Sequence, residues 1–176
     1  MSEHAFVPEE RAGIYRAMAE RRGMRHFSGV EAAPELLARL LESAHQAPCV
    51  GLMQPWRFIR ITRSELRTAI AELVEQERLL SAEALGERGS EFMLLKIEGI
   101  EDCAALPVVA LMEGREACIF GRRTLPKMDL ASAACAIQNL WLAARGEGLG
   151  LGWVSLFAPW RWLNSCRYQW APRSWR

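Results

Sequence analysis

Hydrophobic residues recur every three or four positions in several stretches of this chain, a spacing typical of amphipathic helices. The stretch from Pro8 to Arg22 has a proline and two glutamates in its first turn and is followed by Gly23. These features predict a helix that begins at Pro8. A second helix is predicted over residues 35–47, where five apolar residues form one stripe. Further helices are predicted from Ser64 to about Leu80 and over residues 90–102.

Two shorter stretches, residues 57–62 and 107–113, have the length and composition of strands. Residues 128–145 are apolar nearly all round, which is typical of a helix buried in a protein interior. Residues 149–157 are predicted to form a buried strand. Helices and strands mix without the regular repeat of a doubly wound sheet, and this order predicts an α+β fold.

The composition excludes several classes of protein. The chain has 176 residues, the size of one ordinary domain, and a formal net charge of +1. We therefore expect no nucleic-acid partner and no membrane partner, and no apolar run approaches the ~20 residues that span a bilayer. The five cysteines are scattered and no signal peptide is evident, so we expect reduced thiols and a cytoplasmic protein. The three histidines have no metal-ligand spacing, and no metal site is predicted.

The densest cluster of charge follows the first predicted helix. Arg21, Arg22 and Arg25 lie within five positions around Gly23, and we call residues 21–25 the arginine turn. Guanidinium groups match phosphate oxygens in a bidentate manner, and a glycine lets backbone N–H groups approach a ligand. The turn therefore indicates a phosphate site; the alternative is a solvated surface.

Two other segments contain polar groups in apolar surroundings. The loop that leads into the first strand contains Cys49, Gln54 and Trp56, whose polar groups could hydrogen-bond the edge of a heteroaromatic ring. The alternative for Trp56 and Phe58 is the core, and for Phe58 we favour it. Ser155 is the polar side chain of an apolar stretch; it either satisfies a backbone group or faces a ligand.

The last twenty residues differ from the rest of the chain. They contain four of its seven tryptophans, four arginines and no acidic residue, and they have no helical or strand periodicity. Such a segment could bind a partner by stacking and charge, but we favour a segment without an evolved fold. The expected division is a domain over residues 1–157 and an atypical tail over residues 158–176.

The order of motifs resembles that of the nitroreductase-like flavoprotein superfamily and, within it, the 5,6-dimethylbenzimidazole synthases. The motifs are RR-x-x-R-x-F, HQAP-x-VG-x-MQPWRF, KIEGI and GRRTLPKMDLASAACAIQNLWLAARGEGLGLGWVSLF. The resemblance implies an α+β homodimer, with a mainly antiparallel central sheet flanked by helices and two flavin sites at the subunit interface. It implies an enzyme that fragments reduced FMN with molecular oxygen to 5,6-dimethylbenzimidazole, the lower ligand of vitamin B12. A separate flavin reductase would supply the reduced FMN.

The resemblance also implies roles for particular residues. The phosphate would be bound by Arg21, Arg22 and Arg25, with Gly23 and Met24 lining the same turn. Four further groups would lie near the flavin ring: Cys49, Met53 and Gln54 of the loop; Leu95 and Lys96 of a lid; Met128 and Asp129 of the central helix; and Ser155 near the reacting face. The catalytic positions would be Gly23 and Ser155.

This chain departs from the family pattern at three places. Gly23 stands where the family has an aspartate tied to the fragmentation chemistry, and glycine cannot transfer a proton. Cys49 replaces a serine, and a thiol is the poorer hydrogen-bond donor. The C-terminal strand and tail of the family are altered or missing. Two alternatives therefore stay open: a nitroreductase-type FMN-dependent oxidoreductase, and an inactive flavin-binding remnant.

Overall fold

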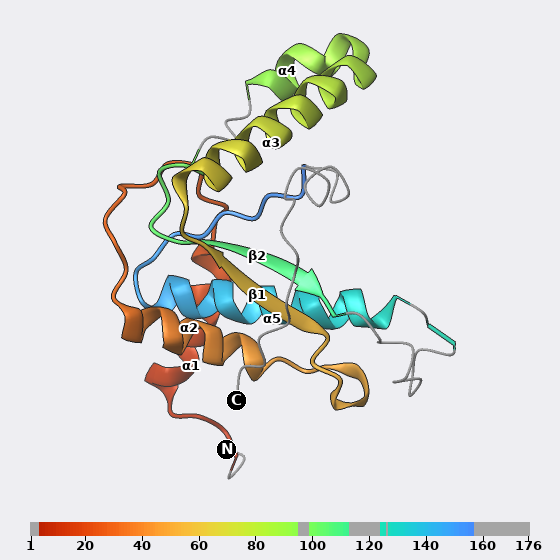
Figure 1. Ribbon diagram of the computed structural model, residues 1–176. Helices are drawn as coiled ribbons and strands as arrows, with labels where there is room; N and C mark the ends of the chain where they lie inside the picture. The colour runs from red at the N-terminus through yellow and green to blue at the C-terminus, as the bar shows by residue number, and fades with distance from the viewer. Residues whose placement is uncertain (1–3, 95–98, 113–123, 126, 157–176) are drawn as a thin grey trace. The chain divides into compact units, whose positions relative to one another are not determined.

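The computed structural model describes residues 4–94, 99–112, 124–125 and 127–156. The chain divides into two compact units, Met1–Thr62 with Asp102–Trp153, and Arg63–Glu101 with Val154–Arg176. The first unit contains the helices α1 (Pro8–Glu20), α2 (Pro34–His45) and α5 (Met128–Gly146) and the strands β1 (Trp56–Ile61) and β2 (Leu106–Leu111) (Figure 1). The expected α+β fold is confirmed.

The first two helices begin as their sequences predict. Each has a proline in its first turn, where a missing N–H costs nothing. Glutamates follow in the first turn, Glu9 and Glu10 in α1 and Glu35 in α2, and their charge is favourable at the positive end of the helix dipole. α1 ends at Glu20, two residues before the predicted end.

The two strands form an antiparallel pair in which Trp56 lies opposite Leu111 and Ile61 lies opposite Leu106. Both strand predictions are confirmed, and β1 begins one residue earlier than expected, at Trp56. Within the residues that the structure describes, the regular sheet has two strands, β1 and β2.

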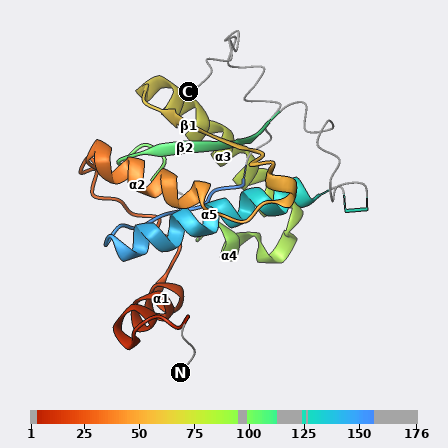
Figure 2. The ribbon, with the colours of Figure 1, turned by 90° about the horizontal axis from the view of Figure 1, so that it is seen from below.

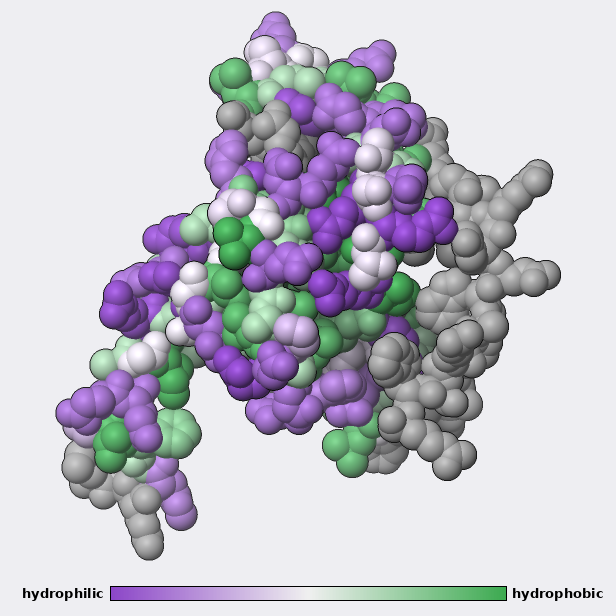
Figure 3. All heavy atoms as spheres, turned by 60° about the vertical axis from the view of Figure 1, so that its left-hand side comes forward, coloured by the Kyte–Doolittle hydropathy of each residue, from purple (hydrophilic) through white to green (hydrophobic). Residues whose placement is uncertain are grey.

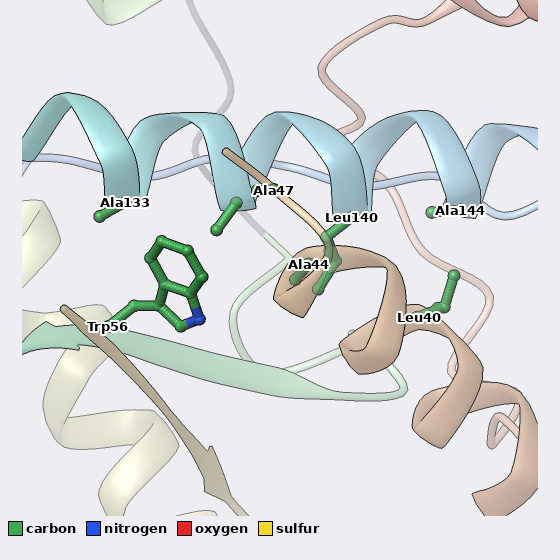
Figure 4. Close-up of a cluster of buried hydrophobic side chains, with 8 residues drawn as sticks. Leu40, Ala44, Ala47, Trp56, Ala133, Leu140 and Ala144 are labelled. Atoms are coloured by element: carbon green, nitrogen blue, oxygen red, sulfur yellow. The ribbon is translucent and has the colours of Figure 1, made fainter. Parts of the chain in front are cut away.

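The core of the first unit lies where α2 and α5, which run side by side, meet the strand pair (Figures 1 and 2). The Trp56 ring, 1% exposed, lies between β1 and α5 (Figure 4). Alanines around it leave room for the indole and let the two helices approach closely. The cluster consists of Leu40, Ala44, Ala47, Trp56, Ala133, Ala136, Leu140 and Ala144.

α5 is buried along one stripe only. Its buried residues recur at spacings of one, three or four positions: Asp129, Ser132, Ala133, Ala136, Leu140 and Ala144. On other sides, Leu130 is 57% exposed and Cys135 is exposed. The expectation of a helix buried all round is therefore wrong for a single chain, because α2, β2 and α1 contact only part of its circumference.

The second unit contains α3 (Ser64–Ala84), a short 3-10 helix (Gly86–Arg88) and α4 (Gly89–Met93), which packs back against α3 (Figure 1). α3 is four residues longer than predicted. The helix predicted over residues 90–102 is confirmed only up to Met93, where α4 ends; residues 100–102 form a turn, and residues 95–98 lie outside the described residues. Gly99, with φ 125°, has a backbone conformation that is incompatible with a helix.

The segment after α5 forms no regular strand over its described residues. One isolated parallel bridge joins Leu151 to Gly23, and Trp153 is 43% exposed. The prediction of a buried strand over residues 149–157 is therefore wrong up to residue 156, because a single bridge leaves the remaining backbone without a ladder partner. The predicted tail, residues 158–176, lies outside the described residues, and the boundary at residue 157 stays a prediction.

Candidate functional site

A cavity opens at the C-terminal ends of α1 and α5, beside the arginine turn. Its volume is about 170 Å³, less than the ~300–1,000 Å³ of pockets that enclose a whole small-molecule ligand. It can therefore hold a group the size of a phosphate but not an entire flavin nucleotide. We call it the arginine cavity, and it is lined by Glu20, Arg21, Arg22, Met24, Trp141, Arg145, Gly148, Leu149 and Gly150.

The arginine turn is held in place by the segment that follows α5. The N–H of Met24 donates a hydrogen bond of 3.0 Å to the carbonyl of Leu151. A Cβ at Gly152 would lie 2.5 Å from the Met24 carbonyl oxygen, and a Cβ at Gly150 would lie 2.6 Å from Met24 Cγ. Both positions are therefore restricted to glycine by the close approach of the two segments.

The three arginines of the turn have different surroundings. Arg21 is half-buried, and its Cζ lies 4.6 Å from the centroid of the Trp141 ring. Arg22 is exposed and donates hydrogen bonds to the carbonyls of Ala19 and Arg21, which satisfies two acceptors at the end of α1. Arg21 and Arg22 line the cavity, whereas Arg25 donates to the carbonyl of Trp153 at 3.4 Å and does not line it.

The carboxylate of the cavity is already paired. Arg145 and Arg16 both donate hydrogen bonds to Glu20, the second at 2.9 Å. These hydrogen bonds, the one from Arg145 having the larger effect and the one from Arg16 the smaller, hold the pKa of the Glu20 carboxyl below its usual range. Among the described residues, Arg21 and Arg22 have no carboxylate partner. Three arginines and one paired glutamate leave the cavity with a positive charge, as an anion requires.

A second group of predicted residues lies on the loop before β1. Three of its residues have a left-handed backbone: Gly51 (φ 57°), Leu52 (φ 52°) and Gln54 (φ 41°). The loop is held by Gln54, whose N–H donates to the Cys49 sulfur at 3.4 Å and whose Nε2 donates to the carbonyl of His45 at 3.2 Å. The thiol of Cys49 therefore serves here as an acceptor.

The same loop is tied to the first turns of α5. The N–H of Val50 donates to Ser132 Oγ at 3.2 Å, and Ser132 Oγ donates to the carbonyl of Met128 at 2.7 Å. Next to them lies Asp129, which is 4% exposed and accepts the N–H of Leu130 at 2.8 Å. The structure thus brings the loop of Cys49, Met53 and Gln54 to the turn that contains Met128 and Asp129.

The predicted site residues form two separate groups on one chain. Ser132 and Trp141 mark the two groups on α5, and their spacing of nine residues corresponds to about 14 Å along the helix. Ser155 is exposed and belongs to the second unit, and Leu95 and Lys96 lie outside the described residues. The role of each of these residues stays a prediction.

Three residues of these groups were not predicted from the sequence: Ser132, Trp141 and Arg145. Trp141 and Arg145 lie four positions apart near the end of a helix, so they share one face. That spacing could have indicated a common role, but it does not reveal which segment the face contacts.

Replacing Leu52 of the left-handed loop with glycine should stabilise the protein. Leu52 is 91% exposed, so Leu52→Gly loses little packing and removes the ~1–2 kcal/mol cost of a left-handed side-chain residue. Because glycine also raises the entropy of the unfolded chain, we expect a net gain of about 0.5–1 kcal/mol in the free energy of unfolding. Urea unfolding measures it. Leu52→Ala is the matched control, since it shortens the side chain and keeps the Cβ; an equal gain in both variants would contradict the strain.

Two further classes of site are not found. Among the described residues no group of His, Cys, Asp or Glu side chains could hold a metal ion. None of the helices within the described ranges is long and apolar enough to cross a membrane.

Comparison with known proteins places this geometry in a family. Residues 18–165 match the Nitroreductase family. A 5,6-dimethylbenzimidazole synthase of Rhodospirillum rubrum is 36% identical over 159 residues, which cover 88% of this chain and 74% of that protein.

Two solved structures show the same fold. Nitroreductase A of Vibrio parahaemolyticus superposes with a TM-score of 0.57 at 20% identity, over 78% of this chain; the chain spans 52% of that protein. An oxidized iodotyrosine deiodinase bound to FMN and 3-iodo-L-tyrosine superposes with a TM-score of 0.59 at 23% identity, over 78% of this chain and 71% of that one. The resemblance predicted from the motifs is thereby confirmed: the chain belongs to the nitroreductase family and, within it, to the family of the 5,6-dimethylbenzimidazole synthases.

Proposed function

We propose that this protein binds reduced FMN and, with molecular oxygen, fragments it to 5,6-dimethylbenzimidazole. The observation that supports this most directly is the arginine cavity, because it unites two arginines of the predicted phosphate turn with a third arginine and an aromatic ring. The family relationship supports the reaction class, since the Rhodospirillum rubrum relative is named for this product. A separate flavin reductase would supply reduced FMN.

The residues present fit the phosphate end of FMN. Guanidinium groups are charge-assisted donors to phosphate oxygens, and Arg21 and Arg22 line a space of phosphate size without a carboxylate partner among the described residues. In the proposal Arg21 and Arg22 bind the phosphate in the cavity, and Gly23 and Met24 complete the turn. The phosphate contact of Arg25, which lies outside the lining, stays a prediction. FMN supplies the oxidisable ring system, while the protein orients the ring and excludes water.

The ring end would meet the other group. Cys49, Met53 and Gln54 present a loop whose left-handed backbone is held by hydrogen bonds. Met128 and Asp129 lie at the start of α5, to which Ser132 ties this loop. In the proposal these groups orient the ring. The roles that the resemblance implies for Leu95, Lys96 and Ser155 stay predictions.

The resemblance implies a homodimer, and α1 supports one. No residue of α1 is buried. Ile14 is 41%, Tyr15 68% and Met18 50% exposed, and Figure 3 shows hydrophobic groups open on α1, beside the grey N-terminal residues at the lower left. An apolar helix face of this kind indicates a protein partner, and we assign it to a second copy of the chain.

Met18→Glu tests this surface. A charge buried in an apolar contact is costly, so we expect dimer association to weaken at least about 10-fold. Sedimentation equilibrium measures it. Gly13→Glu adds the same charge about 140° around the helix axis, at a position where a Cβ would meet nothing within 4 Å, and serves as the control. A dimer unaffected by Met18→Glu would show that α1 is not the contact.

A second candidate function is favoured by one observation. Gly23 provides no side chain that could transfer a proton, and a nitroreductase-type oxidoreductase, which passes electrons from reduced FMN to a small acceptor, does not require the family's aspartate there. A flavin-binding remnant without turnover is the third alternative.

The test is aerobic incubation of the purified protein with chemically reduced FMN, followed by chromatography. The proposal expects 5,6-dimethylbenzimidazole above the level of a heat-denatured control. Reduction of a nitroaromatic acceptor with FMN left intact would instead establish the second candidate. Binding of FMN without either product would establish the remnant, and failure to bind FMN would exclude all three.

A further inference from the structure

We propose that Trp141 is a positioning residue for the phosphate of FMN, which it serves by holding the arginine turn in its binding conformation. This inference rests on the proposed function and extends it to a residue outside the family motif of the turn. Trp141 belongs to α5. It donates a hydrogen bond to Arg22, which lies 119 positions earlier in the chain.

One indole ring contacts two consecutive residues of the turn and lies beside the third. Its face lies 4.6 Å from Arg21 Cζ, and its Nε1 donates a hydrogen bond of 3.3 Å to the carbonyl of Arg22. Its Cζ2 is the atom nearest to the Cβ position of Gly23, at 3.8 Å. The ring therefore fixes a side chain, a carbonyl and the path of the backbone together.

The stacking matters because a long side chain must be ordered before it can bind an anion with two parallel hydrogen bonds. A guanidinium over an aromatic face keeps its edge, and hence its N–H groups, available for phosphate oxygens. Ordering Arg21 in advance lowers the entropy lost on binding.

The neighbours of Trp141 support the same arrangement. Trp153 meets it edge to face with ring centroids 6.4 Å apart, and the carbonyl of Trp153 accepts the hydrogen bond from Arg25. Arg145, one helical turn beyond Trp141, pairs with Glu20. The carboxylate that adjoins Arg21 in sequence is thus occupied, and Arg21 faces the ring instead of an ion-pair partner.

The experiment compares FMN with riboflavin, which lacks the phosphate, by fluorescence titration of the purified protein. We expect Trp141→Leu to weaken FMN binding about 10-fold, from the loss of the cation–π contact and one hydrogen bond, and to leave riboflavin binding unchanged. Arg21→Ala and the double variant complete a cycle. Because Trp141 acts through Arg21, the double variant should bind FMN little worse than Arg21→Ala does.

Trp141→Phe keeps an aromatic face and loses the N–H, so its FMN affinity should lie between those of the wild type and Trp141→Leu. It also stands in for Trp141→Leu if thermal unfolding shows that the latter does not fold. Unchanged FMN binding in these variants, or an equal loss for both flavins, would overturn the positioning role while the proposed function stands. A wild type that binds FMN no better than riboflavin would instead remove the phosphate site itself, and this inference with it.

Discussion

Gly23→Asp should raise the yield of 5,6-dimethylbenzimidazole from reduced FMN and oxygen by about two to four powers of ten, the usual contribution of a general acid or base. The resemblance to the 5,6-dimethylbenzimidazole synthases implies an aspartate at this position in that family. A carboxylate beside the bound flavin can transfer a proton, which the hydrogen atom of a glycine side chain cannot. FMN affinity should not rise in parallel, because guanidinium groups bind the phosphate.

The structure has room for this side chain. A Cβ at Gly23 would lie 3.8 Å from Trp141 Cζ2, an ordinary van der Waals contact. Gly23 is not among the residues with positive φ, so aspartate can adopt its backbone conformation without the left-handed penalty. The substitution should therefore change the chemistry without disturbing the turn.

The measurement is product yield at saturating reduced FMN. Gly23→Asn is the matched control, since its amide has the shape of the carboxylate but is neither an acid nor a base at neutral pH. If the wild type already gives the same product yield as the aspartate variant, another group, such as Ser155 or an ordered water, transfers the proton.

Arg21→Ala should weaken FMN binding about 10- to 150-fold, the equivalent of ~1.5–3 kcal/mol for a charge-assisted hydrogen bond. Arg21 is expected to have the largest effect in the turn because it is half-buried in the cavity lining, whereas Arg25 lies outside the lining. Riboflavin binding should stay the same.

Arg39→Ala is the control for the loss of one positive charge. Arg39 pairs with Glu147 at the end of α5, through hydrogen bonds of 3.2 and 3.3 Å, and does not line the cavity. Both variants are titrated with FMN and riboflavin at the same ionic strength, because salt screens charge effects. If Arg39→Ala weakens FMN binding as much as Arg21→Ala, the effect is one of net charge and not of contact.

The elements that could be predicted from the sequence are those whose signals are local. Pro8 and Pro34 mark helix starts, because propensity and periodicity act within a few residues. The stripe predicted for α2 contains its two buried residues, Leu40 and Ala44, but it is too wide, since Leu41 is 39% exposed. α4 was overestimated for the same reason: apolar residues continue past Met93, but the described turn at residues 100–102 cannot be seen from apolar spacing.

The candidate site could be predicted only in part. The arginine turn was visible because its charges are adjacent in sequence. Its partners Trp141 and Arg145 were not, because nothing in a helical sequence states which distant segment its face will meet. Gly150 and Gly152 lie in the stretch predicted as a buried strand, and the pattern of that stretch does not reveal that both are required for the close approach of Met24.

That close approach also sets when the site can exist. Arg25 and Trp153 meet although 128 positions separate them, and closing such a loop costs about 4 kcal/mol of chain entropy. On a ribosome adding ~5–20 residues per second, the three arginines emerge well before the glycine segment, by about 6 to 25 s. Throughout that interval the nascent chain has the charges of an anion site but no cavity. The proposed phosphate site therefore forms late in biosynthesis, and a chain interrupted before residue 150 would contain the complete arginine turn but not the cavity.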